Sequence, residues 1–142
     1  MHDLHGKRVL VVEDDYLIGT MVSDMLMSVG ALVIGPARTR DQGLTIARTE
    51  SLDVAVLDLN LRGESGDQIA AELRRRHIPF VVATGYSEQA RAGHTNAPVL
   101  EKPFTEEMLF DVLDALLTDE VVNRHVERER TSDSDTLSTL HV

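Results

Sequence analysis

Residues 9–15 read Val-Leu-Val-Val-Glu-Asp-Asp, a short apolar run followed directly by three acids. A continuous apolar run of this length is typical of a strand buried on both faces, as strands in parallel sheets are. The acids would then lie at the carboxyl end of that strand. The stretch therefore predicts a buried strand that ends in a polar cluster.

Four more apolar runs alternate with helical patterns along the chain. The runs cover residues 31–34, 54–57, 80–83 and 99–100, and the first of these is expected to end at Gly35-Pro36. Helices are expected over about 18–29, over about 40–50, after a loop at 62–66, and after Thr105. Five strands alternating with helices predict an α/β fold, a doubly wound five-stranded parallel sheet covered on both faces.

One helix of this pattern is weak. Between Thr84 and Val99 the candidates for an apolar helical face are Tyr86, Ala90 and Ala92. A helix built on them would bury little surface and would be marginal by itself. We therefore expect a short or mobile fourth helix.

Two groups of side chains are expected to have structural roles. Met21, Met25 and Met27 mostly follow the apolar stripe of helix 18–29 and are expected to fill the core. Arginines 74–76 end the third helix, where cations suit the helix dipole, and are expected to be solvated.

Composition limits the class of protein. The 142 residues include no cysteine, which excludes disulfides, thiolate metal sites and cysteine nucleophiles. A net charge of −10 argues against a nucleic-acid partner. No apolar run approaches the ~20 residues that cross a bilayer, and the start lacks the plan of a signal peptide, so we expect a cytoplasmic protein without a membrane partner. Residues 1–117 are expected to form one domain and 118–142 an acidic tail, partly helical or disordered.

Polar residues follow the predicted strands where each strand ends. They are Glu13-Asp14-Asp15, Asp58, Thr84 and Glu101-Lys102-Pro103. Ligands of open parallel sheets bind at the carboxyl ends of the strands, beside the point where strand order switches. We therefore expect these side chains, scattered in sequence, to converge on one pocket.

The charges in that pocket favour a cation. Glu13, Asp14 and Asp58 would raise one another's pKa, and a hard divalent cation relieves this repulsion. Mg²⁺ prefers oxygen ligands and retains several waters. Two direct carboxylates, a backbone carbonyl near Asn60 and waters held by Glu13 would fit it. Lys102 adds a compact positive charge that can pair with a carboxylate or a phosphoryl oxygen.

A carboxylate beside Mg²⁺ and a lysine can also act as a nucleophile and form an aspartyl phosphate. Phosphoryl transfer mainly needs in-line positioning and neutralisation of the equatorial oxygens. Mg²⁺, Lys102 and the hydroxyl of Thr84 would supply those contacts.

Four motifs in order resemble the receiver domain of two-component response regulators, over about residues 7–117. They are Val11-Val12-Glu13-Asp14-Asp15, Val56-Leu57-Asp58-Leu59-Asn60, Ala83-Thr84-Gly85 and Lys102-Pro103-Phe104. The resemblance implies a flavodoxin-like strand order 2-1-3-4-5. It also implies a cis Lys102-Pro103 peptide bond, which is a deliberate feature where it occurs.

The resemblance also assigns roles at the site. Asp58 is similar to the phosphoacceptor, and Asp14 to the carboxylate ligand of Mg²⁺, with Glu13 as its partner. The Asn60 carbonyl is similar to the third protein ligand. Thr84 corresponds to the switch hydroxyl and Lys102 to the phosphate-sensing lysine.

Two positions bear on the subgroup. Many receivers carry an aromatic switch residue three positions before the lysine, where this chain has Val99. Residues 82–86, Val-Ala-Thr-Gly-Tyr, resemble the signature of single-domain receivers named for Phe-Ala-Thr-Gly, with Val82 in place of Phe. Tyr86 is a hypothetical substitute for the missing aromatic.

The expected function is a stand-alone phospho-acceptor switch and not a turnover enzyme. Its phosphodonor would be a sensor histidine kinase or a histidine phosphotransfer protein, and its output protein contact or service as a phosphate sink. The alternative is a phosphohydrolase with an aspartate nucleophile, but such enzymes usually have an acid where this chain has Asn60, and an amide cannot serve as general acid. A flavin or nucleotide binder would need a Gly-rich phosphate loop, which is absent from the sequence.

Overall fold

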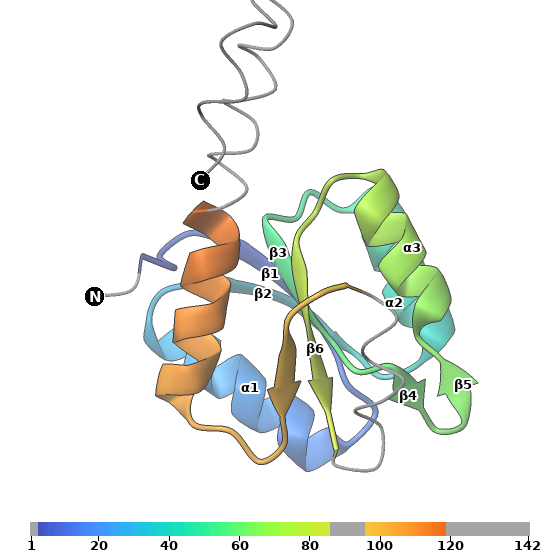
Figure 1. The fold of residues 1–142 in the computed structure, drawn as a ribbon, viewed down its shortest axis with the longest axis horizontal. Coiled ribbons are helices and arrows are strands. Elements are labelled where there is room, and N and C mark those ends of the chain that lie inside the picture. The colour runs from blue at the N-terminus through green and yellow to red at the C-terminus, as the bar shows by residue number, and fades with distance from the viewer. Residues whose placement is uncertain (1–2, 86–95, 119–142) are drawn as a thin grey trace, which may run out of the picture.

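The computed structural model describes residues 3–85 and 96–118. Its centre is a five-stranded parallel sheet in the order β2-β1-β3-β6-β7 (Figure 1). The strands are β1 Arg8–Val12, β2 Leu32–Ala37, β3 Val54–Leu57, β6 Phe80–Thr84 and β7 Val99–Glu101. Counted along the parallel sheet, this is the predicted order 2-1-3-4-5, which the structure confirms.

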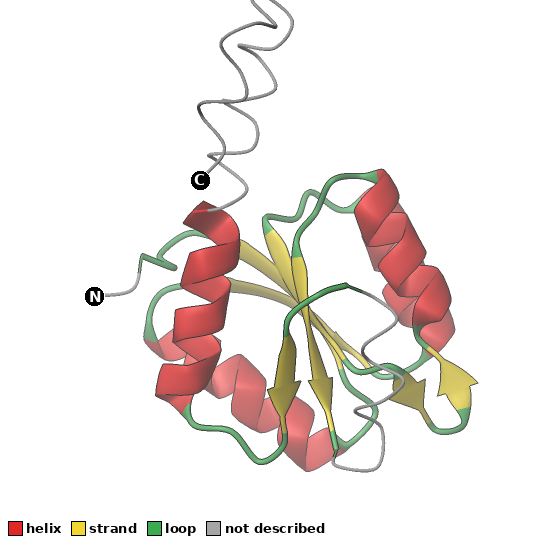
Figure 2. Ribbon diagram, viewed as in Figure 1, coloured by secondary structure: helices red, strands yellow, loops and turns green. Residues whose placement is uncertain are grey.

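Helices cover both faces of the sheet. They are α1 Tyr16–Ser28, α2 Arg40–Thr49, α3 Asp67–Arg75 and a last helix over residues 106–118. Figures 1 and 2 show α1 and the last helix on one face, with α2 and α3 on the other. The doubly wound arrangement expected from the sequence is therefore correct.

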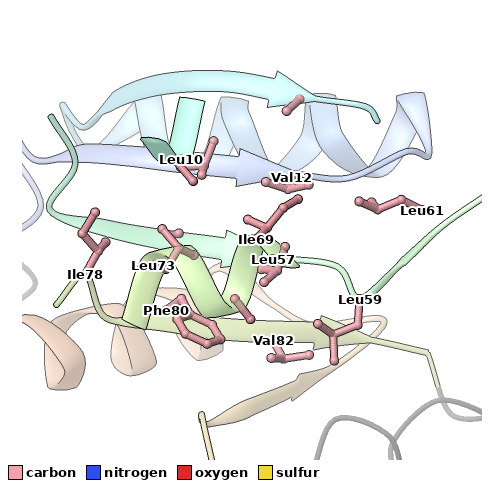
Figure 3. Close-up of a cluster of buried hydrophobic side chains, with 14 residues drawn as sticks. Leu10, Val12, Leu57, Leu59, Leu61, Ile69, Leu73, Ile78, Phe80 and Val82 are labelled. Carbon is pink, nitrogen blue, oxygen red and sulfur yellow. The ribbon is translucent and has the colours of Figure 1, made fainter. Parts of the chain in front are cut away.

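Alternate residues of β1 supply the two cores. Val9 and Val11 belong to the cluster on the α1 side, whereas Leu10 and Val12 belong to the cluster on the α2 and α3 side. Figure 3 shows the second cluster, in which the side chains of α3 reach down onto the sheet. Fully burying one such aliphatic side chain contributes about 1.5–3 kcal/mol. Burial on both faces explains why residues 9–12 of the strand are all apolar.

Side-chain caps begin three of the helices. Oδ1 of Asp15 accepts a hydrogen bond from the Ile18 N–H (3.1 Å) at the start of α1. Oγ1 of Thr39 accepts one from the Gln42 N–H (3.1 Å) at the start of α2. Thr105 caps the last helix in the same way. Such caps typically contribute about 1 kcal/mol each. The predicted starts of α2 and of the last helix are confirmed, whereas α1 begins at Tyr16, two residues before the expected start.

The second strand does not end at Gly35-Pro36. Strand β2 continues to Ala37 through a cis Gly35-Pro36 bond, and its register with β1 shifts there. A Cβ at Gly35, where φ is +110°, would lie 2.8 Å from the carbonyl oxygen of Val11. Proline is tolerated because β2 is an edge strand. Pairing resumes with the hydrogen bond from the Glu13 N–H to the Ala37 carbonyl (2.9 Å), so the predicted end was wrong.

The segment 62–66 is only partly a loop. Strands β4 Asn60–Leu61 and β5 Glu64–Ser65 form a small antiparallel hairpin. Arg62 and Gly63 make its turn, and both have positive φ values of 54° and 85°. Two successive positive φ values are the mark of the two-residue turn that matches the twist of a hairpin.

The expectations that the three methionines fill the core and that arginines 74–76 are solvated were both wrong in part. Met21 and Met27 are about half exposed, at 48% and 54%. Nη1 of Arg76 donates to the carbonyls of Ala47 (2.6 Å) and Glu50 (2.8 Å) at the end of α2. That arginine therefore satisfies carbonyls that the end of a helix leaves without an internal partner.

Several expectations fall beyond the described residues. The fourth helix and Tyr86 lie in 86–95, and all but the first residue of the expected tail lies in 119–142. Within 3–85 and 96–118, the chain has no helix with the length and apolar character needed to cross a membrane.

Candidate functional site

Three carboxylates meet at the carboxyl ends of β1 and β3. An oxygen from each of Glu13, Asp14 and Asp58 lies within 4.8 Å of the others. Strand register brings them together, because β1 and β3 are neighbours and Val12 pairs with Leu57. Glu13 and Asp58 are each only 4% exposed, whereas Asp14 is half-buried. The three carboxylates that were expected to lie close together do so, whereas Asp15 caps α1 instead.

Lys102 enters this cluster from the end of β7. Its Nζ lies 2.5 Å from Oε1 of Glu13 and 3.0 Å from Oδ2 of Asp58. The backbone supports this position, since the Lys102 N–H donates to the Thr84 carbonyl (2.8 Å). The Lys102-Pro103 bond is cis, as expected.

Burial and charge shift the pKa values of this pair. Burial raises the pKa of Glu13 to about 7, although the hydrogen bonds from Lys102 and from the Asp15 backbone oppose the rise. Burial alone would lower the pKa of Lys102, but Glu13 and Asp58 hold it above its usual value. The single ammonium of Lys102 thus faces two buried acids, Glu13 and Asp58. The carboxyl group of Glu13 is still partly protonated close to neutral pH.

The donor set fits a hard divalent cation. All the candidate ligand atoms are oxygens, which is the preference of Mg²⁺. Three carboxylates meet there and Lys102 pairs with two of them, so negative charge remains that Lys102 does not neutralise. A cation with two charges would relieve that excess, so the residues present fit Mg²⁺.

Asn60 lies against the acceptor candidate through its backbone. Its N–H donates to Oδ1 of Asp58 (2.9 Å). Its side-chain Oδ1 accepts from the Gly63 N–H (3.0 Å) and so helps to close the hairpin. Because the side-chain oxygen serves the turn, the backbone carbonyl is the candidate ligand of this residue.

Thr84 ends β6 at the same edge of the sheet and is 1% exposed. Its hydroxyl donates to the Gly85 carbonyl (2.7 Å) and, within the described part of the chain, not to a carboxylate of the cluster. Val99, in place of the aromatic residue of many receivers, opens β7 and is 40% exposed.

Sequence reasoning missed Arg62. Its Nε lies 3.9 Å from Oδ2 of Asp14, across the mouth of the cluster. The pair Arg62-Gly63 is the signal that could have found it, because two such residues between two short strands indicate the turn of a hairpin.

An apolar groove adjoins the cluster. Ile18, Met21, Val22 and Met25 of α1 form one wall, and residues 102–104 form the other. Tyr16 and Leu17, at the start of α1, are 70% and 68% exposed. Lys102 therefore belongs both to the acidic cluster and to the rim of the groove.

Comparison with known proteins identifies relatives. The family model described as the response regulator receiver domain matches residues 9–114. The transcriptional regulatory protein PdtaR of Mycobacterium tuberculosis is 30% identical over 104 residues, which cover 70% of this chain and 51% of PdtaR. The phyllosphere-induced regulator PhyR of Methylorubrum extorquens is 32% identical over 101 residues, or 68% of this chain and 38% of PhyR. The chain thus spans about half the length, or less, of these relatives.

Two solved structures share the fold. SdrG from Sphingomonas melonis Fr1 is 38% identical, with a TM-score of 0.72 over 79% of this chain and 97% of SdrG. The receiver domain of the sensor histidine kinase PA1611 from Pseudomonas aeruginosa is 23% identical, with a TM-score of 0.72 over 80% of this chain and 98% of that domain. The PA1611 domain holds a magnesium ion in its active-site cleft. At that identity the likeness concerns the fold.

Proposed function

Because this chain belongs to the receiver domain family of two-component response regulators, we propose that it is a phospho-acceptor switch in which Asp58 receives the phosphoryl group. The observation that carries the proposal is the contact of Oδ2 of Asp58 with Nζ of Lys102 at 3.0 Å, inside a cluster of three carboxylates. A nucleophilic carboxylate beside a fixed cation is what acyl phosphate chemistry requires.

In this proposal a carboxylate oxygen of Asp58 attacks phosphorus, and the bond from phosphorus to the donor imidazole nitrogen breaks. The nitrogen keeps the electron pair, so the donor leaves as histidine. Asp14, Asp58 and the Asn60 carbonyl would hold Mg²⁺, with Glu13 holding its waters. When bound, Mg²⁺ supplies positive charge for the phosphoryl oxygens.

The side chains around Asp58 then change partners. Formation of the acyl phosphate removes the charge on the attacking carboxylate, so Lys102 would exchange its contact with Asp58 for a phosphoryl oxygen. The Thr84 hydroxyl, which donates to the Gly85 carbonyl, would turn to another phosphoryl oxygen. These two exchanges at the ends of β6 and β7 are the proposed switch.

The proposed phosphodonor is a sensor histidine kinase or a histidine phosphotransfer protein. A phosphohistidine must reach bonding distance of Asp58, so its carrier has to seat beside the cluster. The groove between α1 and residues 102–104 offers apolar surface for a helix of that carrier. We also propose that the phosphoryl transfer takes place in the cytoplasm. The proposed output is contact with another protein, or service as a phosphate sink.

The alternative of an aspartate-nucleophile phosphohydrolase is less favoured. Position 60, two residues after Asp58, holds an amide that cannot exchange protons as a general acid. Its side-chain oxygen is also engaged by Gly63. We therefore propose slow self-dephosphorylation and no turnover of free phosphate esters.

The test is labelling with acetyl phosphate in Mg²⁺, followed by mass spectrometry of the intact chain. The unmodified chain should gain one phosphoryl group, and Asp58→Asn should gain none. Asp41→Asn, on the exposed face of α2, is the matched control and should be labelled normally. Labelling that persists in Asp58→Asn would refute the assignment.

A further inference from the structure

The β4–β5 hairpin holds Arg62 beside the acidic cluster. At its base the Gly66 N–H donates to the Leu59 carbonyl (2.8 Å). On its outer strand Glu64 pairs with Nη2 of Arg40 (3.2 Å), which ties the hairpin to α2. The turn residue Arg62 is therefore carried on an anchored element, and its position next to the cluster does not depend on its own side chain.

The cluster divides its carboxylates between two cations. Lys102 lies within ion-pair distance of Glu13 and Asp58. Asp14 is paired instead with Arg62, at 3.9 Å between Oδ2 and Nε. Among the ion pairs of residues 3–85 and 96–118, Lys102 does not reach Asp14. The cation that pairs with Asp14 is Arg62.

The two cations differ in how readily they can be displaced. The Lys102 side chain is 17% exposed, whereas that of Arg62 is 78% exposed and that of Asp14 is 21% exposed. A long contact from a solvated arginine is weak and open to salt. Arg62 can therefore leave Asp14 while Lys102 remains in place.

We propose that Arg62 is a positioning residue that occupies Asp14 until a divalent cation replaces it, and so sets the affinity of the cluster for Mg²⁺. This inference rests on the metal site of the proposed function. Mg²⁺ has to break the pair with Arg62 and to approach against its positive charge, and both effects weaken binding. Removal of the guanidinium should therefore tighten Mg²⁺ binding.

The experiment is titration of the full chain with MgCl₂ by isothermal calorimetry at low and high ionic strength. Arg62→Ala should lower the Kd for Mg²⁺ roughly two- to fivefold, the range of one exposed ion pair. Arg62→Lys, which keeps the charge, should stay near the unmodified chain. The gain in Arg62→Ala should shrink in 0.5 M NaCl, because salt already screens the pair.

Arg75→Ala is the matched control, since Arg75 is also an exposed arginine and pairs with Glu72 of the same helix. It should leave the Kd unchanged, and an equal gain there would reduce the effect to net charge and overturn the inference. An unchanged or weaker affinity in Arg62→Ala, with normal binding by the unmodified chain, overturns the inference and leaves the proposed function standing. Failure of the unmodified chain to bind Mg²⁺ would overturn both.

Discussion

The Nζ atom of Lys102 lies 2.5 Å from Oε1 of Glu13, yet the pKa of that glutamate is raised to about 7. The ion pair does not offset the burial of the carboxyl group. A buried pair of this kind is weak evidence for stability, because desolvation can exceed the attraction between the charges. The pair instead holds a cation against Asp58.

Substitution Lys102→Ala should separate metal binding from signalling. The carboxylates proposed to bind Mg²⁺ remain, so the Kd for Mg²⁺ should be retained or improved. The phosphorylated form should lose its conformational response, because no ammonium is left to pair with a phosphoryl oxygen. Heteronuclear NMR spectra with and without acetyl phosphate test this. Lys7→Ala, which removes the same charge from a partly exposed lysine outside the cluster, is the control. A phosphorylation-linked shift as large as that of the unmodified chain would contradict the sensing role.

The pKa of Glu13 predicts how stability changes with pH in the absence of Mg²⁺. The folded chain holds this proton up to about pH 7, whereas the carboxyl group has its ordinary pKa of 4.5 in the unfolded chain. The favourable contribution is therefore complete below about pH 4.5 and is lost as the pH rises through 7. The pKa difference corresponds to about 3 kcal/mol.

Urea unfolding at pH 5 and pH 8 measures this loss. In Glu13→Gln the difference between the two pH values should be smaller by about 2–3 kcal/mol. The other ionisable groups are the same in both proteins, so their contribution cancels in the comparison. Equal pH dependence of the two proteins would show that Glu13 ionises normally in the folded chain.

Gly66 allows the base of the β4–β5 hairpin to pack closely against the backbone that follows β3. A Cβ at this position would lie 2.8 Å from the Asp58 carbonyl oxygen and 3.2 Å from Cα of Leu59. Backbone atoms cannot move aside as a flexible side chain does. Gly66→Ala should therefore destabilise the fold by about 1–3 kcal/mol and weaken Mg²⁺ binding by displacing Asp58.

Gly85→Ala is the control, since a Cβ there meets no atom of the described residues within 4 Å. Urea unfolding and Mg²⁺ titration of the two variants provide the comparison. If Gly66→Ala matches the unmodified chain in both measurements, the close packing at that position is not needed.

The parts of the fold that local patterns encode were predictable. Short apolar runs gave the strands, and the spacing of Thr39 and Gln42 gave the start of α2, because burial and capping act within a few residues. The cluster of Glu13 and Asp58 followed from a rule about strand ends. Its detailed pairing did not, since the 2.5 Å contact of Lys102 with Glu13 depends on side-chain geometry.

Errors arose where long-range packing overrides a local signal. Gly35-Pro36 reads as a stop, but β2 continues because a neighbouring strand offers partners beyond the proline. Arg62 and Asp14 are far apart in sequence, and they meet only because a hairpin turn carries the arginine across. The pair Arg62-Gly63 can indicate the turn, but no local pattern shows that the turn lies beside Asp14.

Arg76 provides a test of a contact between helices that sequence reasoning assigned to solvent. Its guanidinium donates from Nη1 to the carbonyls of Ala47 and Glu50, and so joins the end of α3 to the end of α2. Hydrogen bonds from a charged group typically contribute about 1.5–3 kcal/mol. Arg76→Ala should therefore lower the free energy of unfolding by about 2 kcal/mol in urea titration. Arg75→Ala removes a more exposed arginine next to it, whose pair with Glu72 is screened by solvent, and should lower the free energy of unfolding far less. Because Arg76 makes its contacts at the end of α2 and not with the carboxylates, the Kd for Mg²⁺ should stay unchanged in both variants; equal stabilities of the two would mean that the carbonyls of α2 find water as good a partner as Arg76.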